Sequence, residues 1–133
     1  MVIMKQVVSI IIINDDNHIL LQLRDDKSSI PFPNKWVTLG GQVEKGESPE
    51  EAIKRELMEE IEFDLVDYKF LKSYEWSDRI EFVFQANLNF NLETIPLHEG
   101  QKIEYFSKEQ ILNMNLAFDD DELFRDFFEN HLD

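Results

Sequence analysis

Two apolar segments near the start of the chain, separated by a polar break, predict a pair of β-strands. Residues 6–13 and 18–23 are rich in Val, Ile and Leu, whereas residues 14–17 are all polar. Large apolar runs that flank a cluster of Asn and Asp are typical of a β-hairpin. Residues 25–35, which contain two prolines and several polar side chains, are expected to form a loop.

A helix is predicted from residue 49 to about residue 61. Its apolar residues recur at every fourth position and form one buried face: Ile53, Leu57 and Ile61. Ser48 is a favoured N-cap residue, Pro49 suits the first helical position, and Glu51 completes a capping box. The start of this helix is therefore well defined by the sequence.

The rest of the chain predicts further strands and two more helices. Strands are expected over residues 36–39, 66–75, 79–90 and 102–106. A second capping box, Ser107 with Gln110, opens a short helix, and residues 120–131 form a final amphipathic helix. Strands that precede, separate and follow helices favour an α/β (α+β) fold with a mixed sheet covered on both faces.

The composition fits a single globular domain that spans residues 1–133. The hydrophobic fraction of 43% is enough for a sizeable core, and the formal net charge is −15. A surface this acidic argues against DNA or RNA polymers as partners, but it does not exclude a small anionic ligand. The chain has no cysteine and no apolar run of the roughly 20 residues that a membrane span requires. We therefore expect a cytoplasmic protein without membrane association.

Three acidic residues of the predicted helix, Glu56, Glu59 and Glu60, are spaced at i, i+3 and i+4 and form what we term the acidic triplet. Because a helix turns once every 3.6 residues, the triplet falls on one side of it. Like charges this close repel each other unless a cation lies between them. Oxygen ligands without a nearby Cys or His favour Mg²⁺ or Mn²⁺ over Zn²⁺. The pattern thus predicts a divalent metal site.

The acidic triplet is part of a longer pattern that resembles the signature of the Nudix hydrolase family. The matching positions are Gly41-x5-Glu47-x7-Arg55-Glu56-Leu57-x-Glu59-Glu60. A Glu–Glu pair alone would arise by chance in so acidic a chain, whereas this many specified positions would not. The resemblance implies a Nudix-type α/β/α sandwich with a mixed β-sheet. It also implies hydrolysis of a nucleoside diphosphate linked to another group X, with Mg²⁺ as cofactor or Mn²⁺ as a substitute.

The resemblance further implies different roles for the residues of this pattern. The acidic triplet would bind the metal, and one of its members would also accept the proton of the attacking water. Glu47 and Arg55 would hold the loop against the helix and orient the ligands. The carbonyl of Gly40 would be a further ligand, because a glycine lets the backbone approach the metal closely.

Two residues outside this pattern are candidates for the same site. Glu99 is followed by Gly-Gln, as is a glutamate in the bacterial nucleoside triphosphate pyrophosphohydrolases of the MutT type, which this chain resembles most. By this resemblance Glu99 is a general base or an added metal ligand, although a solvated loop acid is the alternative. Arg24, at the end of a predicted strand, is either a phosphate-binding residue or an ordinary surface arginine.

Phe118, Asp119 and Asp120 are the candidates for contacting the nucleobase. In the enzymes that the chain resembles, an Asn or Asp near this place reads the base, and a carboxylate there would accept a hydrogen bond from an exocyclic amine or a ring N–H. The competing interpretation is that the two acids supply the N-cap and the first-turn charges of the last helix.

One position departs from the family pattern, because Glu62 stands where the family usually has Gly. A Gly there ends the helix in a left-handed conformation, which costs any other residue about 1–2 kcal/mol. Either the helix continues past Glu62 or its C-terminal cap is strained.

These observations predict a pyrophosphohydrolase that cleaves a nucleoside triphosphate to the monophosphate and pyrophosphate by water attack at phosphorus. An oxidised purine nucleotide is one candidate substrate, and ADP-ribose or a nucleotide sugar is an alternative. A non-catalytic nucleotide-binding or regulatory module of the same fold is an alternative of another class, but a pure binder has no need for the acidic triplet. Dimers are common among similar proteins, so a homodimer is a further expectation.

Overall fold

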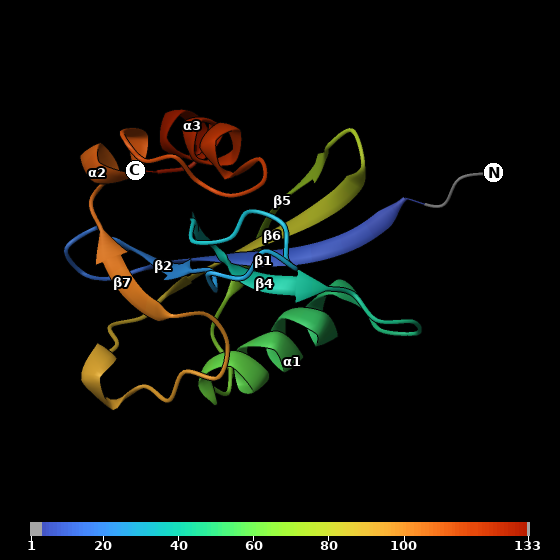
Figure 1. Cartoon of the computed structure of the whole chain (residues 1–133), viewed down its shortest axis with the longest axis horizontal. Coiled ribbons are helices and arrows are strands. Elements are labelled where there is room, and N and C mark those ends of the chain that lie inside the picture. The colour runs from blue at the N-terminus through green and yellow to red at the C-terminus, as the bar shows by residue number, and fades with distance from the viewer. Residues whose placement is uncertain (1–3, 133) are drawn as a thin grey trace.

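The computed structural model describes residues 4–132 and shows helices on both sides of a β-sheet (Figure 1). Its strands are β1 (Lys5–Ile13), β2 (Ile19–Leu23), β3 (Trp36–Val37), β4 (Leu39–Gln42), β5 (Lys69–Glu75), β6 (Arg79–Asn87) and β7 (Lys102–Phe106). Its helices are α1 (Pro49–Ile61), α2 (Lys108–Leu112) and α3 (Asp120–Asn130), with a 3-10 turn, η1 (Leu92–Thr94). In the part of the chain described, no helix has the length and apolar character needed to cross a membrane.

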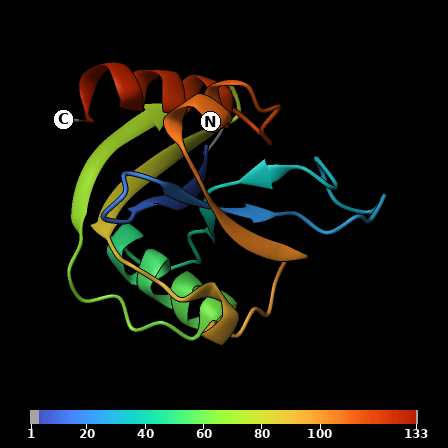
Figure 2. The ribbon, with the colours of Figure 1, turned by 90° about the vertical axis from the view of Figure 1, so that its left-hand side faces the viewer.

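Strand β1 organises the sheet, because three other strands pair with it. It runs parallel to β6 along its whole length, from Lys5 opposite Arg79 to Ile13 opposite Asn87. It is antiparallel to β2 and to β4. Strand β5 extends the sheet beyond β6, while β3 and β7 both pair with β2. The result is a mixed, curved sheet that lies between α1 and α3 (Figure 2).

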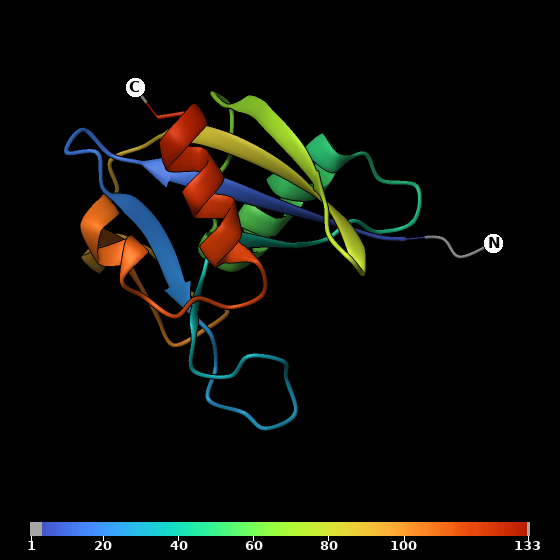
Figure 3. The ribbon, with the colours of Figure 1, turned by 90° about the horizontal axis from the view of Figure 1, so that it is seen from above.

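The alternation of side chains along β1 gives the sheet two buried faces. Val8, Ile10 and Ile12 pack with the apolar face of α1, whereas Ile11 and Ile13 pack with α3. The residues that α3 buries are Leu123, Phe124, Phe127 and Phe128. Figure 3 shows α3 lying across the strands on its side of the sheet. The near-continuous apolar run of β1 therefore reflects burial on both faces.

The α/β/α sandwich predicted from the sequence is confirmed. The hairpin of β1 and β2, the capped helix α1 and the amphipathic helix α3 are present at the predicted places. Helix α1 ends at Ile61, and Glu62 is left-handed with φ 52° and ψ 39°. Of the two alternatives for this position, the strained cap is therefore the correct one.

Three strand predictions are wrong in their bounds. The strand expected over residues 36–39 is two strands, and β4 continues through Gly40 and Gly41 because both glycines pair with β1. Strand β5 begins at Lys69 and not at residue 66, since its ladder with β6 begins there. Strand β6 ends at Asn87 and not at residue 90, because its partner β1 ends at Ile13.

Candidate active site

Helix α1 carries most of the candidate residues, and its N-terminal cap fixes how they are oriented. The Ser48 hydroxyl accepts a hydrogen bond from the Glu51 N–H at 3.1 Å, and the Glu51 carboxylate accepts one from the Ser48 N–H at 2.9 Å. Because the apolar face of the helix packs on the sheet, Glu56 and Glu60 are drawn inward and are only 9% and 1% exposed. Carboxylates are rarely buried without a partner, and Arg55 supplies one for Glu56 but not for Glu60.

Glu99 forms a cluster of three carboxylates with Glu56 and Glu60, which we call the carboxylate cluster. One oxygen atom from each lies within 4.8 Å of the other two, and no other group of this kind occurs among residues 4–132. Burial, together with the nearby Glu99 and Glu56, raises the pKa of Glu60 to about 10. Burial also raises the pKa of Glu56. The Oε2 atom of Glu60 is buried and has no hydrogen-bond partner.

The carboxylate cluster fits a divalent cation. Its donors are all hard carboxylate oxygens, which match the preference of Mg²⁺ and Mn²⁺. A cation among them would favour the charged form of each carboxylate and would give the orphaned oxygen of Glu60 a partner.

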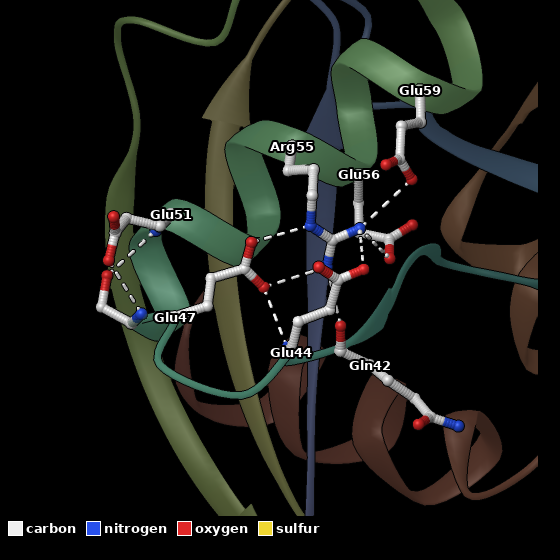
Figure 4. A network of polar contacts seen from close by, with 8 residues as sticks. Gln42, Glu44, Glu47, Glu51, Arg55, Glu56 and Glu59 are labelled. Atoms are coloured by element: carbon white, nitrogen blue, oxygen red, sulfur yellow. Dashed lines mark hydrogen bonds and ion pairs between the residues drawn. The ribbon is translucent and has the colours of Figure 1, made fainter.

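Arg55 is the centre of a network beside the cluster (Figure 4). Its Nε and Nη2 donate to the two oxygens of Glu47 at 2.7 and 3.0 Å, which ties the loop before α1 to the helix. Nη2 also donates to the Gln42 carbonyl at 2.9 Å, and Nη1 donates to Glu56 at 3.0 Å. The hydrogen bond from Arg55 is the main cause that lowers the pKa of Glu47. A positioning role for Glu47 and Arg55 requires such an arrangement, and the role itself stays a prediction.

Glu59, the third member of the acidic triplet, lies outside the carboxylate cluster. Its side chain is 59% exposed and accepts a hydrogen bond from Arg55 Nη1 at 3.2 Å. The structure therefore brings together two acids of the triplet and Glu99 from the loop before β7. The assignment of Glu59 as a metal ligand stays a prediction.

A cavity of about 540 Å³ opens beside the carboxylate cluster. The predicted site residues in its wall are Arg24, Gly40, Arg55, Glu56, Glu59, Glu99, Phe118 and Asp120. Glu47, Glu60 and Asp119 lie outside this wall. The volume falls within the usual range for small-molecule sites. Residues from the strand ends, the helix and two loops thus converge on one space.

The two glycines of β4 allow the backbone to pass close to the site. A Cβ atom on Gly41 would overlap the carboxylate of Glu56. A Cβ atom on Gly40, whose φ is +153°, would overlap the carbonyl of Val8 on β1. Whether the Gly40 carbonyl binds a metal stays a prediction.

We expect Gly41→Ala to weaken Mn²⁺ binding by about tenfold or more while the protein stays folded, because the added methyl group displaces the Glu56 carboxylate. Isothermal titration calorimetry with Mn²⁺ would measure this. The matched control is Gly46→Ala, because nothing lies within 4 Å of a Cβ there, although its φ of +81° makes the change strained. The control should lower the melting temperature without changing Mn²⁺ affinity. Wild-type affinity in Gly41→Ala would contradict the expectation.

Asp120 lies in the first turn of α3, as the competing interpretation expects, and it is also buried in the cavity wall. Its side chain is 2% exposed, and Oδ2 accepts hydrogen bonds from the N–H and the hydroxyl of Thr38 at 2.9 and 3.2 Å. Burial and the neighbouring Glu81 raise the pKa of Asp120 to about 7. Near neutral pH this carboxyl group can therefore donate as well as accept a hydrogen bond.

Asp119 takes the N-cap position of α3, but its side chain forms no cap hydrogen bond. It pairs instead with Arg79 Nη1 at 2.9 Å. The predicted N-cap position is therefore confirmed, but the carboxylate does not cap the helix because the charge of a buried arginine competes for it. Since Asp119 lies outside the cavity wall, its substrate contact stays a prediction without a geometric basis.

Phe118 and Arg24 lie together in the cavity wall. The Phe118 ring is 4.7 Å from the ring of Phe32 between centroids, and the guanidinium carbons of Arg24 and Arg79 lie 5.1 and 5.4 Å from its centre. Arg24 also donates from Nε to the Pro31 carbonyl at 3.0 Å. Phe118 has φ 54°, a strained conformation for a residue with a side chain.

A polar group in the cavity wall, formed by Ser9, Arg79 and Glu81, was not predicted from the sequence, and all three residues are less than 9% exposed. Glu81 accepts hydrogen bonds from the Ser9 hydroxyl at 2.6 Å and from Trp76 Nε1 at 2.8 Å, and Arg79 lies 3.9 Å away. The signal in the sequence was weak. Ser9 is the only polar residue between positions 7 and 13, and a polar residue inside a buried strand marks a functional or hydrogen-bonded position.

Comparison with known proteins finds the same family that the sequence pattern resembles. The model of the NUDIX domain family matches residues 4–127. The solved structure of a MutT protein from Methanosarcina mazei is 26% identical, with a TM-score of 0.76, and 96% of each chain is covered. That of the ORF135 protein from Escherichia coli is 32% identical, with a TM-score of 0.72, and the match covers 95% of this chain and 89% of that one.

Among curated proteins, a nucleoside triphosphatase from Escherichia coli, NudI, is 40% identical over 57 residues, which is 43% of this chain. The match spans only about two-fifths (39%) of the length of that relative.

Proposed function

Since the chain belongs to the Nudix family, we propose that it is a Mg²⁺-dependent pyrophosphohydrolase of a nucleoside diphosphate linked to X. The favoured substrate is a nucleoside triphosphate, cleaved to the monophosphate and pyrophosphate. One observation carries the proposal: the carboxylate cluster beside the cavity contains a buried, unpartnered oxygen of Glu60. A protein that only bound nucleotides would gain nothing from three converging carboxylates whose mutual repulsion destabilises the fold.

Glu56, Glu60 and Glu99 would hold the cation, and Glu59 is close enough to the same cavity to join them. When bound, Mg²⁺ offsets the charge of the phosphates and lowers the pKa of the attacking water. Glu99 is also our candidate for the general base, because it is exposed whereas Glu60 is buried. Arg55 and Glu47 keep Glu56 in place through the network described above.

The remaining wall of the cavity suits a nucleoside. Arg24 is a cation close to the space and would meet the negative charge of a phosphate. Phe118 offers an aromatic surface, and Asp120 offers a carboxyl group that gives or takes a hydrogen bond. These groups support a base-containing ligand, and the partly matching relative NudI is named as a nucleoside triphosphatase.

A substrate panel tests the proposal. Nucleoside triphosphates, oxidised purine triphosphates, ADP-ribose and nucleotide sugars are incubated with the protein and Mg²⁺, and we expect at least one to be hydrolysed and none in EDTA. Reaction in ¹⁸O-labelled water should place the label on a phosphate of the product, because water attacks phosphorus. Glu56→Gln should lower kcat by about a hundredfold or more, whereas Glu109→Gln, an exposed acid on α2, should leave it unchanged.

If no compound is hydrolysed while some bind Glu56→Gln as tightly as the wild type, the protein is a nucleotide-binding module and the proposed function is wrong.

A further inference from the structure

Glu62 and His98 connect the end of α1 to the loop that carries Glu99. The Nε2–H of His98 donates to Oε2 of Glu62 at 2.6 Å, and the backbone N–H of His98 donates to the Glu60 carbonyl at 2.9 Å. A carboxylate only accepts, so the imidazole is the donor in this pair. Glu62 reaches His98 from the left-handed cap position of α1, with φ 52°. The loop is thus attached to the same helix turn that carries Glu60.

The other side of the same loop is attached to β2. The Gln101 N–H donates to the Leu23 carbonyl at 2.8 Å, and the Gln22 side chain donates to the Glu99 carbonyl. Gly100, with φ +81°, packs so closely on the Leu23 carbonyl that a Cβ there would overlap it. Glu99 therefore lies between two attachment points, one on β2 and the other on α1.

We propose that the Glu62–His98 hydrogen bond is a positioning device that holds the Glu99 carboxylate beside Glu56 and Glu60 and so sets the affinity of the carboxylate cluster for a divalent cation. This inference rests on the metal site of the proposed function and adds two residues to it. Neither residue touches the cation or the substrate, and both act through Glu99.

The energetics of the pair favour this role over a role in stability. A left-handed conformation costs Glu more stability than it would cost Gly. The Glu62 and His98 side chains are 56% and 54% exposed, and a pair this exposed contributes little to the stability of the fold. The contact therefore does not offset the strain of Glu62. The end of the helix accounts for the left-handed backbone, since the Glu62 N–H donates to the Met58 carbonyl at 3.1 Å and the Phe63 N–H donates to the Leu57 carbonyl at 3.3 Å. Gly would form the same bonds at lower cost, so the Glu62 side chain is the feature that the contact with His98 explains.

The test is Mn²⁺ affinity of the full chain, measured by electron paramagnetic resonance of free Mn²⁺, together with the melting temperature in EDTA. We expect Glu62→Gly to raise the Kd for Mn²⁺ about threefold to fivefold, and to leave the melting temperature unchanged or higher because the cap strain is relieved. His98→Ala should give the same loss of affinity. Hydrogen exchange at the amides of residues 98–101 should become faster in both variants.

Three controls separate positioning from other causes. Glu62→Gln keeps an acceptor oxygen at the same place and should stay within about twofold of the wild-type Kd. Asp64→Asn removes an exposed charge two residues away and should change nothing. In a Glu99→Gln background, Glu62→Gly should cause no further loss, because the pair acts through Glu99.

Wild-type affinity in Glu62→Gly, an equal loss in Glu62→Gln, or an additive loss on top of Glu99→Gln would overturn the inference and leave the proposed function standing. Failure of the wild type itself to bind Mn²⁺ would instead refute the metal site, and the positioning role with it.

Discussion

Glu60→Gln is expected to stabilise the metal-free protein by up to about 3 kcal/mol at pH 7 and to reduce Mg²⁺-dependent hydrolysis by roughly 10²–10⁴-fold. Both effects have the same cause. Glu60 is 1% exposed and lies near two other carboxylates, so its charge is unfavourable until a cation arrives. Gln has the same shape without the charge, but its amide is a poor substitute for a carboxylate as a ligand.

The pH dependence of stability gives the sign of this effect. The pKa of Glu60 is raised from 4.5 in the unfolded chain to about 10 in the folded protein. Between these values the folded state holds a proton that the unfolded state has released. The contribution of Glu60 to the free energy of unfolding is therefore fully present below about pH 4.5 and is lost as the pH rises towards 10. Over this range the free energy of unfolding falls by up to about 1.4 kcal/mol per pH unit. Asp120 acts in the same direction, but only up to its pKa of about 7.

Urea unfolding in EDTA between pH 7 and 9, compared between the wild type and Glu60→Gln, therefore tests the contribution of Glu60. The wild type should lose stability over this range, and Glu60→Gln should lose much less. Saturating Mg²⁺ should flatten the wild-type slope, because a cation favours the charged carboxylate. Glu129→Gln, an exposed acid on α3, should retain the wild-type slope. Parallel slopes in Glu60→Gln and the wild type would show that Glu60 titrates normally and needs no cation.

The parts of the fold that sequence reasoning predicted well are those that local chemistry decides. The capping box of Ser48 and Glu51 requires only residues three apart, and the β1–β2 hairpin requires only a polar turn between apolar runs. The bounds of β4, β5 and β6 were less accurate because a strand ends where its partner ends. That information lies elsewhere in the chain.

The same limit applies to the site. Each residue of a helix turns by about 100°, so Glu56 and Glu60 lie about 100° and 60° from the buried Leu57, whereas Glu59 lies about 160° away. The prediction that all three acids lie on one side of α1 is therefore only roughly right. Because Leu57 packs into the core, Glu56 and Glu60 point inward and Glu59 does not. Ser9 and Glu81 are 72 positions apart and meet only because β1 and β6 are parallel neighbours. No local pattern reports such a pair.

Arg55→Lys is expected to lower the melting temperature in EDTA by about 5 °C or more and kcat by about 10–100-fold. The Arg55 guanidinium donates to both oxygens of Glu47 and to the Gln42 carbonyl. It also bonds to Glu56 and Glu59. A lysine has a single ammonium group and cannot reproduce this planar set of donors. The loop before α1 would then lose its attachment, and Glu56 would lose the donor that orients it.

The effect of Arg55→Lys distinguishes this orienting role from a simple charge effect. Arg55→Lys keeps the positive charge, so a network that needed only charge would retain both stability and kcat. A matched change on α3, Arg125→Lys, alters an exposed arginine and should affect neither quantity. Thermal unfolding and steady-state kinetics on the two variants measure the difference.

Because Glu47 accepts two of the lost hydrogen bonds, Glu47→Gln should reproduce part of the Arg55→Lys defect, and the double variant should be less than additive. Full additivity would mean that the two residues act separately and that the loop is not held through them.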